Sequence, residues 1–182
     1  MKTLSAIFDG DEKINSRRSL AINGFVFGIL NDNSVTCWGR GANGALGYGN
    51  PGHIGDDEIP GGNSVDLGGA ATQITAGSDQ TCALLADGSV RCWGRGNDGA
   101  LGYGNSESIG DDELPSTVGT LDLDGKRAIY IEAGNEFTCA YMEDRSLYCW
   151  GHNLFGQLGY GHTDFISDDI GESASSEGPV AY

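Results

Sequence analysis

A tryptophan-containing segment occurs three times in this chain, and this repetition constrains the fold more than any other feature. The copies read CWGRGANGALGYGN, CWGRGNDGALGYGN and CWGHNLFGQLGYGH. Their tryptophans, Trp38, Trp93 and Trp150, lie 55 and then 57 residues apart. A period of this length is typical of stacked or radially repeated supersecondary units, so the sequence predicts an array of about three repeats rather than one unique core.

The composition favours short strands over helices. The 182 residues include 31 glycines and only 38% apolar residues, which leaves little material for thick helical cores. Each repeat contains a short strand (73–76 and 128–133 in the second and third copies), a hairpin such as TCALLADGSVRCWG, a glycine-rich segment and a long polar connection. Alternating apolar and polar residues around the turns predict an all-β fold.

The charge balance argues against nucleic acid as a partner. The chain has 10 Lys and Arg and 26 Asp and Glu, which gives a formal net charge of −16. A negative charge of this size repels phosphate polymers. The longest apolar run, from Leu20 to Leu30, is interrupted and is too short to cross a bilayer, so no membrane span is expected. Acidic residues precede any apolar stretch at the N-terminus, so it does not read as a secretory signal peptide.

Two pairs of cysteines are spaced for cross-strand disulfides. A three-residue turn at 86–88 places Cys82 opposite Cys92, at a non-hydrogen-bonded pair whose Cα separation of about 4.5 Å is within disulfide reach. The same spacing places Cys139 opposite Cys149. The expected pairs are Cys82–Cys92 and Cys139–Cys149.

The other two turns deviate from the Cys82–Cys92 hairpin. In the third copy Arg145 takes the position that prefers glycine or asparagine, so we expect a strained or differently built turn. In the first copy Phe27 stands opposite Cys37, which is therefore a predicted free thiol, available for a covalent link between subunits.

The repeated pairing indicates an oxidising compartment and hence an extracellular or cell-surface location. The alternative is a set of reduced, buried strand cysteines in a cytosolic protein. A zinc site is disfavoured, because the chain has no CxxC and His53, His152 and His162 do not recur with the cysteines at ligand spacing.

Each repeat carries an acidic loop: IGDDEIP, IGDDELP and FISDDIG. The candidate Ca²⁺ ligands in these loops are Asp56, Asp57, Asp111, Asp112, Asp168 and Asp169. We favour the alternative that these aspartates cap turn amides and stay solvated, with no cofactor bound, since no loop has EF-hand spacing. Arg40, Arg95 and His152 follow each WG; they could bind an anion, and ion pairs with the repeated aspartates are the favoured interpretation.

Several motifs recur in an order that resembles the regulator of chromosome condensation repeat family. They are AGSDQTCALLADGSVRCWG, AGNEFTCAYMEDRSLYCWG and the NDGALGYG and NLFGQLGYG segments, and the resemblance covers roughly residues 20–170. It implies a β-propeller, most often seven-bladed, with four-stranded blades. The namesake proteins promote nucleotide exchange on a small GTPase and engage chromatin, but no position here matches their functional residues. The cysteine-paired form resembles bacterial, often secreted, members of the family.

The predicted organisation is a non-repeat segment (1–20), about three propeller-type repeats (21–171) and a C-terminal tail (172–182). Three blades are too few to close a propeller alone, so association with a second copy or with further blades is expected. The residues expected to pack between blades are Trp38, Trp93, Trp150, Leu46, Leu101, Leu158, Tyr48, Tyr103 and Tyr160.

No nucleophile motif, phosphate-cradling loop or acid–base pair stands out from the repeats, so an enzyme is not expected. The first functional hypothesis is a non-enzymatic extracellular binding or scaffold module. The second is a structural protein that assembles into filaments or surfaces, and a regulator of a small GTPase is a weaker third.

Overall fold

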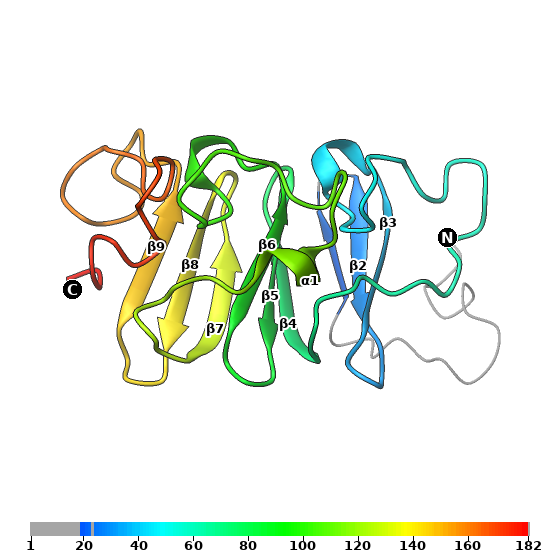
Figure 1. Cartoon of the computed structure of the whole chain (residues 1–182), viewed down its shortest axis with the longest axis horizontal. Helices are drawn as coiled ribbons and strands as arrows, with labels where there is room; N and C mark the ends of the chain where they lie inside the picture. The colour runs from blue at the N-terminus through cyan, green and yellow to red at the C-terminus, as the bar shows by residue number, and fades with distance from the viewer. Residues whose placement is uncertain (1–18, 23, 182) are drawn as a thin grey trace.

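The computed structural model describes residues 19–22 and 24–181, and it contains three antiparallel sheets that stand side by side along the long axis (Figure 1). Each sheet is called a blade here. Blade 1 consists of β1 (Ser19–Ile22), β2 (Phe25–Ile29) and β3 (Val35–Gly39). Blade 2 consists of β4 (Ala71–Ala76), β5 (Gln80–Leu85) and β6 (Val90–Gly94). Blade 3 consists of β7 (Ala128–Ala133), β8 (Phe137–Met142) and β9 (Leu147–Gly151). Short helical turns are η2 (Ala42–Gly44), η3 (Asn97–Gly99) and α1 (Pro115–Val118).

The hairpins form as the sequence predicts. Phe27 pairs with Cys37 in blade 1, and Cys82 and Cys139 pair with their predicted partners in blades 2 and 3. The third position of each turn has a positive φ, which is 67° at Asn33, 84° at Gly88 and 73° at Arg145. The arginine turn is therefore built like the other two, with Arg145 in the left-handed region that glycine favours.

A repeated aspartate shapes each turn. Asp32, Asp87 and Asp144 accept hydrogen bonds from both the backbone N–H and the hydroxyl of the serine two residues later, at 2.5 to 2.9 Å. Such a side-chain bond imitates a backbone turn, which explains why three different residues can occupy the following position.

In the described part of the chain each blade has three hydrogen-bonded strands, and the fourth strand of the expected blade is reduced to single bridges. The place beside the outer strand is taken by the long connection, which pairs with it at isolated antiparallel bridges rather than along a ladder. These bridges join Gly39 to Ile54, Gly94 to Ile109 and Gly151 to Ile166. Glycine-rich and acidic segments have little strand propensity, which accounts for pairing at single residues rather than along a ladder.

A second set of contacts shows where each connection ends. The amides of Val65 and Leu121 donate to the first residue of β3 and β6, and Val180 donates likewise to Leu147 at 2.8 Å. The hydroxyl of Tyr160 donates to Gly178, as Tyr103 does to Gly119. Residues up to Val180 thus continue the third repeat, where the sequence suggested a separate tail.

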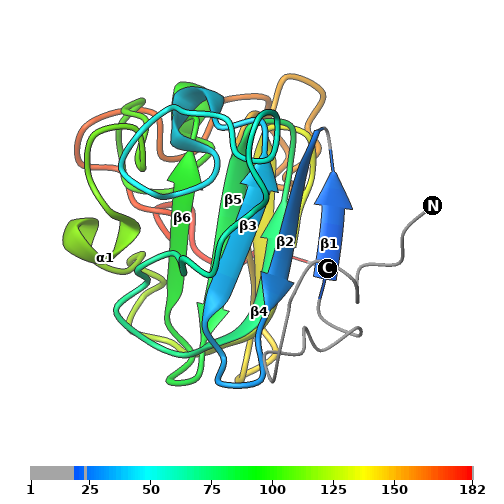
Figure 2. The same cartoon turned by 90° about the vertical axis from the view of Figure 1, so that its right-hand side faces the viewer.

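The N-terminal boundary also differs slightly from the expected one, because β1 begins at Ser19 and already pairs with β2. The rest of the segment predicted as non-repeat, 1–18, lies outside the described residues. Figure 2 views the array from the blade 1 end, with β1 at one edge of its sheet. No helix in the described part of the chain has the length and apolar character that a membrane crossing requires.

Candidate interaction surface

The blades pack face to face, and each face has its own chemistry. The side of blade 2 that faces blade 3 carries Gln80 and Cys82: the Gln80 amide donates to Gly134 at 3.2 Å, and Cys82 Sγ lies 3.7 Å from Thr138 Oγ1. The opposite side faces blade 1, where the Thr81 hydroxyl donates to Ala45 at 3.4 Å. Every blade therefore has a forward face, toward higher residue numbers, and a backward face.

The tryptophan of each repeat belongs to the backward face. Trp93 is fully buried, and its indole N–H donates to Ala45 of blade 1 at 3.1 Å. A methyl group added at Gly47 would lie 2.8 Å from the same indole nitrogen, and one added at Gly102 would lie equally close to Trp150. Glycine at these two positions lets the next tryptophan lie directly on the backbone.

Among residues 19–22 and 24–181, no further blade covers the forward face of blade 3, and we call this surface the open face. It carries Tyr130, Phe137, Cys139 and Tyr141, which occupy the register positions of Gln73, Gln80, Cys82 and Leu84 in blade 2. Gln73 and its blade 2 neighbours are covered by blade 3, and all six residues of β5 are buried. In β8, by contrast, burial alternates and the open-face residues are partly exposed.

The rim of the open face is apolar as well. Phe155, in the loop after β9, is 89% exposed, and Leu154 beside it is 51% exposed. On β7, Tyr130 is 51% exposed. Exposed apolar side chains of this size make the open face and its rim a candidate interaction surface.

The leucines and tryptophans predicted to pack between blades are buried, with the exception of Trp38. Leu46, Leu101 and Leu158 are each 1% exposed and belong to the core. Trp93 and Trp150 are fully buried, whereas Trp38 is half-buried, because within the described residues no blade precedes its own.

The tyrosines have a role that sequence reasoning missed. Tyr48, Tyr103 and Tyr160 accept a hydrogen bond from the amide of the cysteine in the outer strand, at 3.1 to 3.2 Å. Each hydroxyl then donates to the connection of its own repeat. The tyrosine thus ties the connection to the sheet inside one blade. The constant distance from cysteine to tyrosine in the repeat was the available signal.

The acidic loops lie at the junctions between blades. The glycine of the top turn in one blade touches the acidic loop of the next: a Cβ at Gly44 would lie 2.4 Å from the Asp111 amide nitrogen, and one at Gly99 would lie 2.7 Å from that of Asp168. The first loop has no preceding blade in the described residues, and Asp56 and Asp57 are exposed. The periodic loops therefore take part in blade packing through their backbone.

In two of the acidic loops, the turn amide bonds to a glutamate rather than to one of the aspartates that the sequence suggested as caps. Glu58 accepts a hydrogen bond from Gly55 at 2.8 Å, and Glu172 accepts one from Ser167 at 2.9 Å. Asp57 and Glu58 share a hydrogen bond, which raises the pKa of Asp57 and lowers that of Glu58. Three carboxylates approach one another at 56–58 and again at 111–113. Asp168 and Asp169 form no such group among the described residues.

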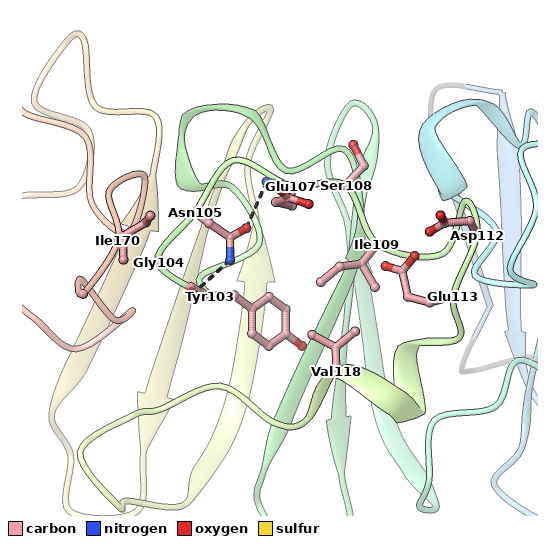
Figure 3. Close-up of a pocket in the computed structure, with 11 residues that line it drawn as sticks. Tyr103, Gly104, Asn105, Glu107, Ser108, Ile109, Asp112, Glu113, Val118 and Ile170 are labelled. Carbon is pink, nitrogen blue, oxygen red and sulfur yellow. Dashed lines mark hydrogen bonds between the residues drawn. The ribbon is translucent and has the colours of Figure 1, made fainter.

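The second acidic loop borders a wide hollow of about 600 Å³ (Figure 3). The figure shows Asp112 and Glu113 together at one side, with Tyr103 and Ile170 farther along the wall. Burial, followed by the nearby Asp112, raises the pKa of Glu113. The hollow is open to solvent and its lining is mixed.

The basic residues after each WG pair with carboxylates, but not with the repeated loop aspartates that the sequence suggested. Arg40 lies 2.8 Å from Asp79 Oδ1, and Arg95 lies 3.6 Å from Glu136 Oε1. Both partners belong to the turn before the middle strand of the next blade. These ion pairs bridge blades because that turn, rather than the acidic loop, lies in front of the guanidinium group.

The cysteines occupy the predicted positions. Cys82 and Cys92 are joined with an S–S distance of 2.06 Å, and Cys139 and Cys149 with one of 2.09 Å. Cys37 is free but buried, and its thiol donates to Leu46 at 2.7 Å. Burial raises the pKa of Cys37, so the thiol is neither ionised nor accessible for the predicted covalent link between subunits.

The geometry defines a propeller-type repeat array, and comparison with known proteins agrees. Two models described as regulator of chromosome condensation (RCC1) repeat match residues 71–100 and 128–157, and residues 87–141. The chain therefore carries RCC1 repeats.

Relatives and solved structures extend this finding. The chain is 37% identical over 91 residues to the ultraviolet-B receptor UVR8 of Arabidopsis thaliana, covering 50% of this chain and 20% of the receptor. It is 33% identical over 140 residues to the human E3 ubiquitin-protein ligase HERC2, covering 76% of this chain and 3% of the ligase. The structure of Prp20p from Saccharomyces cerevisiae matches 90% of this chain and 38% of that chain, with a TM-score of 0.66 and 16% identity. The chain thus spans a fifth or less of these two relatives.

Proposed function

We propose that this chain is a protein-binding module that associates through its terminal blade faces, chiefly the open face of blade 3. The carrying observation is internal to the chain: the equivalent faces of blades 1 and 2 are each covered by a following blade, while Tyr130, Tyr141 and Phe155 are partly or largely exposed. Among the similar structures, Prp20p binds Gsp1p and histones, and yeast RCC1 (Prp20) is bound to Kap60, which supports protein rather than small-molecule recognition.

The proposed partner surface is the backward face of another blade, from a second copy or from further repeats. Backward faces in this chain present small residues and a tryptophan, as Thr81 and Trp93 do against blade 1. A backward face fits the open face because a forward face already packs on a backward face twice within the chain, between blades 1 and 2 and between blades 2 and 3. A head-to-tail contact of this kind closes into a ring or extends into a filament, depending on the rotation.

The proposal includes a location for the protein and two alternative functions. An extracellular or cell-surface location is supported by the two disulfides. A structural, self-assembling protein is the second candidate, because the same open face would drive it. Regulation of a small GTPase is the weaker third candidate and rests on the family resemblance alone.

Sedimentation velocity over a range of concentrations tests the proposal. The purified chain should sediment as species larger than a monomer, and Tyr141→Glu or Phe155→Ser should shift the distribution toward monomer. Ile170→Ser is the matched control: this residue is 96% exposed but borders the hollow near Tyr103 rather than the open face. Association that survives both open-face changes, or that Ile170→Ser abolishes, would refute this use of the surface.

A further inference from the structure

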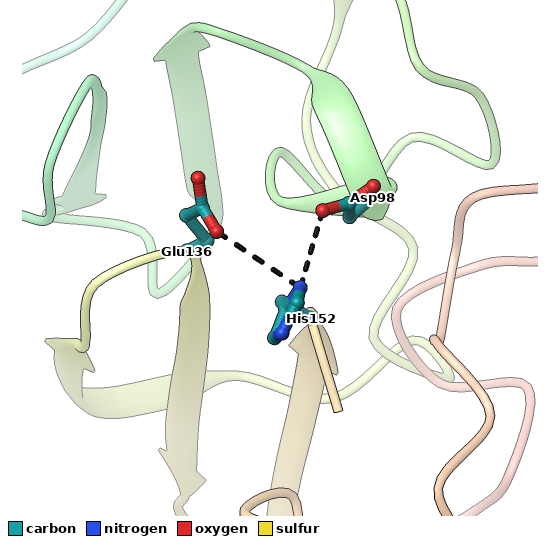
Figure 4. Close-up of side chains that lie close together, drawn as sticks. All are labelled: Asp98, Glu136 and His152. Atoms are coloured by element: carbon teal, nitrogen blue, oxygen red, sulfur yellow. Dashed lines mark hydrogen bonds and ion pairs between the residues drawn. The ribbon is translucent and has the colours of Figure 1, made fainter. Parts of the chain in front are cut away.

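A histidine and two carboxylates meet at the junction of blades 2 and 3 (Figure 4). His152 Nδ1 lies 3.1 Å from Asp98 Oδ2 and 3.9 Å from Glu136 Oε2. One ligand-type atom from each residue lies within 4.8 Å of the others. Asp98 comes from η3 of blade 2, whereas Glu136 and His152 come from blade 3, so the group spans the junction.

The first junction provides an internal comparison. The positions equivalent to Asp98, Glu136 and His152 are Asn43, Asp79 and Arg95. All three positions differ, but Asp79 and Glu136 are both carboxylates. The other two differences change the chemical group: a carboxylate replaces an amide, and an imidazole replaces a guanidinium group. Each change exchanges a poor metal ligand for a good one, since arginine cannot ligate and imidazole is a common ligand.

The local charge changes in the same direction. Arg40, Asp79 and Arg95 at the first junction carry one net positive charge. At the second junction the formal charges of Arg95, Asp98 and Glu136 sum to one net negative charge, with histidine counted as neutral. The second junction therefore attracts a cation, whereas the first repels one.

His152 Nδ1 and Asp98 Oδ2 share a hydrogen bond that a bound ion would replace, and the other contacts leave the ligand atoms accessible. Arg95 lies 3.6 Å from Oε1 of Glu136, so its ion pair uses the oxygen that does not face His152. The ring of Phe165 packs on the imidazole, with 4.7 Å between centroids, and this fixes its orientation. The three side chains are 21% to 37% exposed, which gives an ion a path from solvent.

We propose that Asp98, Glu136 and His152 form a divalent transition-metal site, with Zn²⁺ as the probe ion, that clamps blade 2 to blade 3. Zn²⁺ binds imidazole nitrogen and carboxylate oxygen at about 2.0–2.2 Å, which places neighbouring ligand atoms about 3.3–3.5 Å apart. The present separations of 3.1 and 3.9 Å bracket that range. Water completes the tetrahedron, and the histidine favours Zn²⁺ over Ca²⁺.

Isothermal titration of the untagged full chain with ZnCl₂ tests the site. We expect one ion per chain, with affinity reduced by about tenfold or more in Asp98→Asn and in His152→Arg. These variants restore residues that the first junction already uses, and Asn43 has the same φ of 56° as Asp98, so the fold is retained. Thermal unfolding without zinc verifies that retention.

The matched control is His162→Gln, because His162 also lies near two carboxylates, at 3.5 Å from Asp164 and 3.6 Å from Glu177. This variant should bind Zn²⁺ like the parent chain, and zinc should raise the melting temperature of both. Absence of saturable binding, undiminished binding in both junction variants, or loss of binding in His162→Gln would overturn the proposal.

Discussion

Blades 2 and 3 share one hairpin plan but differ in their surroundings. Both have a cross-strand disulfide, an aspartate-stabilised turn and a buried tryptophan. All of β5 is buried because blades 1 and 3 cover both faces of blade 2, whereas every second residue of β8 remains partly exposed. The repeat motif therefore determines the blade, and the neighbour determines how much of it is buried.

The largest expected difference between a middle and an end position concerns tryptophan. Trp93→Ala removes a fully buried side chain and its bond to Ala45, so it should lower the free energy of unfolding by about 3–5 kcal/mol. Trp38→Ala should lower the free energy of unfolding by clearly less, because Trp38 is only half-buried. Guanidinium unfolding of both variants measures the difference, and equal losses would show that burial against a preceding blade is unimportant.

The two disulfides close loops of equal length, so the chain-entropy contribution of each is about 3 kcal/mol or slightly less. Their accessibility differs, because Cys82 and Cys92 are fully buried while Cys139 is partly exposed on the open face. Under a limiting reductant, Cys139–Cys149 should therefore open first. Alkylation followed by peptide mapping gives the order, and simultaneous reduction would contradict the face assignment.

A glycine pair tests the junction backbone. Gly99 and Gly156 occupy the same repeat position with φ of 69° and 72°, so alanine suffers similar backbone strain at both, about 1–2 kcal/mol. A Cβ at Gly99 would lie 2.5 Å from Ile166 O, whereas at Gly156 the nearest atom is 3.7 Å away. Gly99→Ala should therefore destabilise the protein more than Gly156→Ala. Equal melting temperatures would argue against tight packing at the junction.

The smallest expected effect is the pH dependence of stability that comes from the turn aspartate of each blade. The Ser146 hydroxyl lowers the pKa of Asp144 to about 2, and Ser34 and Ser89 lower the pKa of Asp32 and Asp87. Because the folded pKa lies below the ordinary value of 3.8, this stabilisation is present above pH 3.8 and disappears as the pH falls toward 2. Asp144→Asn should differ most from the parent at neutral pH and least near pH 2 in thermal unfolding. A difference that grows on acidification would contradict this sign.

The intrablade architecture could be predicted because it depends on local periodicity. The turn at Gly88, the pairing of Cys82 with Cys92 and the exception at Phe27 all follow from counting residues outward from a turn. The third repeat was harder to delimit, because the amide of Val180 makes the decisive contact while the surrounding residues differ from those near Val65.

Contacts between blades were less predictable, since they depend on how neighbouring sheets are offset. Arg40 and Arg95 pair with Asp79 and Glu136, and nothing in the repeat spacing distinguishes these carboxylates from the loop aspartates. The group around His152 went unrecognised for the same reason. Its available signal was the replacement of arginine by histidine in the third copy.

The central claim is that the open face of blade 3 accepts another blade. Hydroxyl-radical footprinting at increasing protein concentration tests it at side-chain level, with Phe137, Tyr141 and Phe155 as reporters and buried Phe27 as an internal reference. The account predicts that modification of the three reporters falls as the chain associates, while modification of Phe27 stays low throughout. Reporter modification that is unchanged at concentrations where the chain has associated, or a chain that remains monomeric throughout, would contradict it.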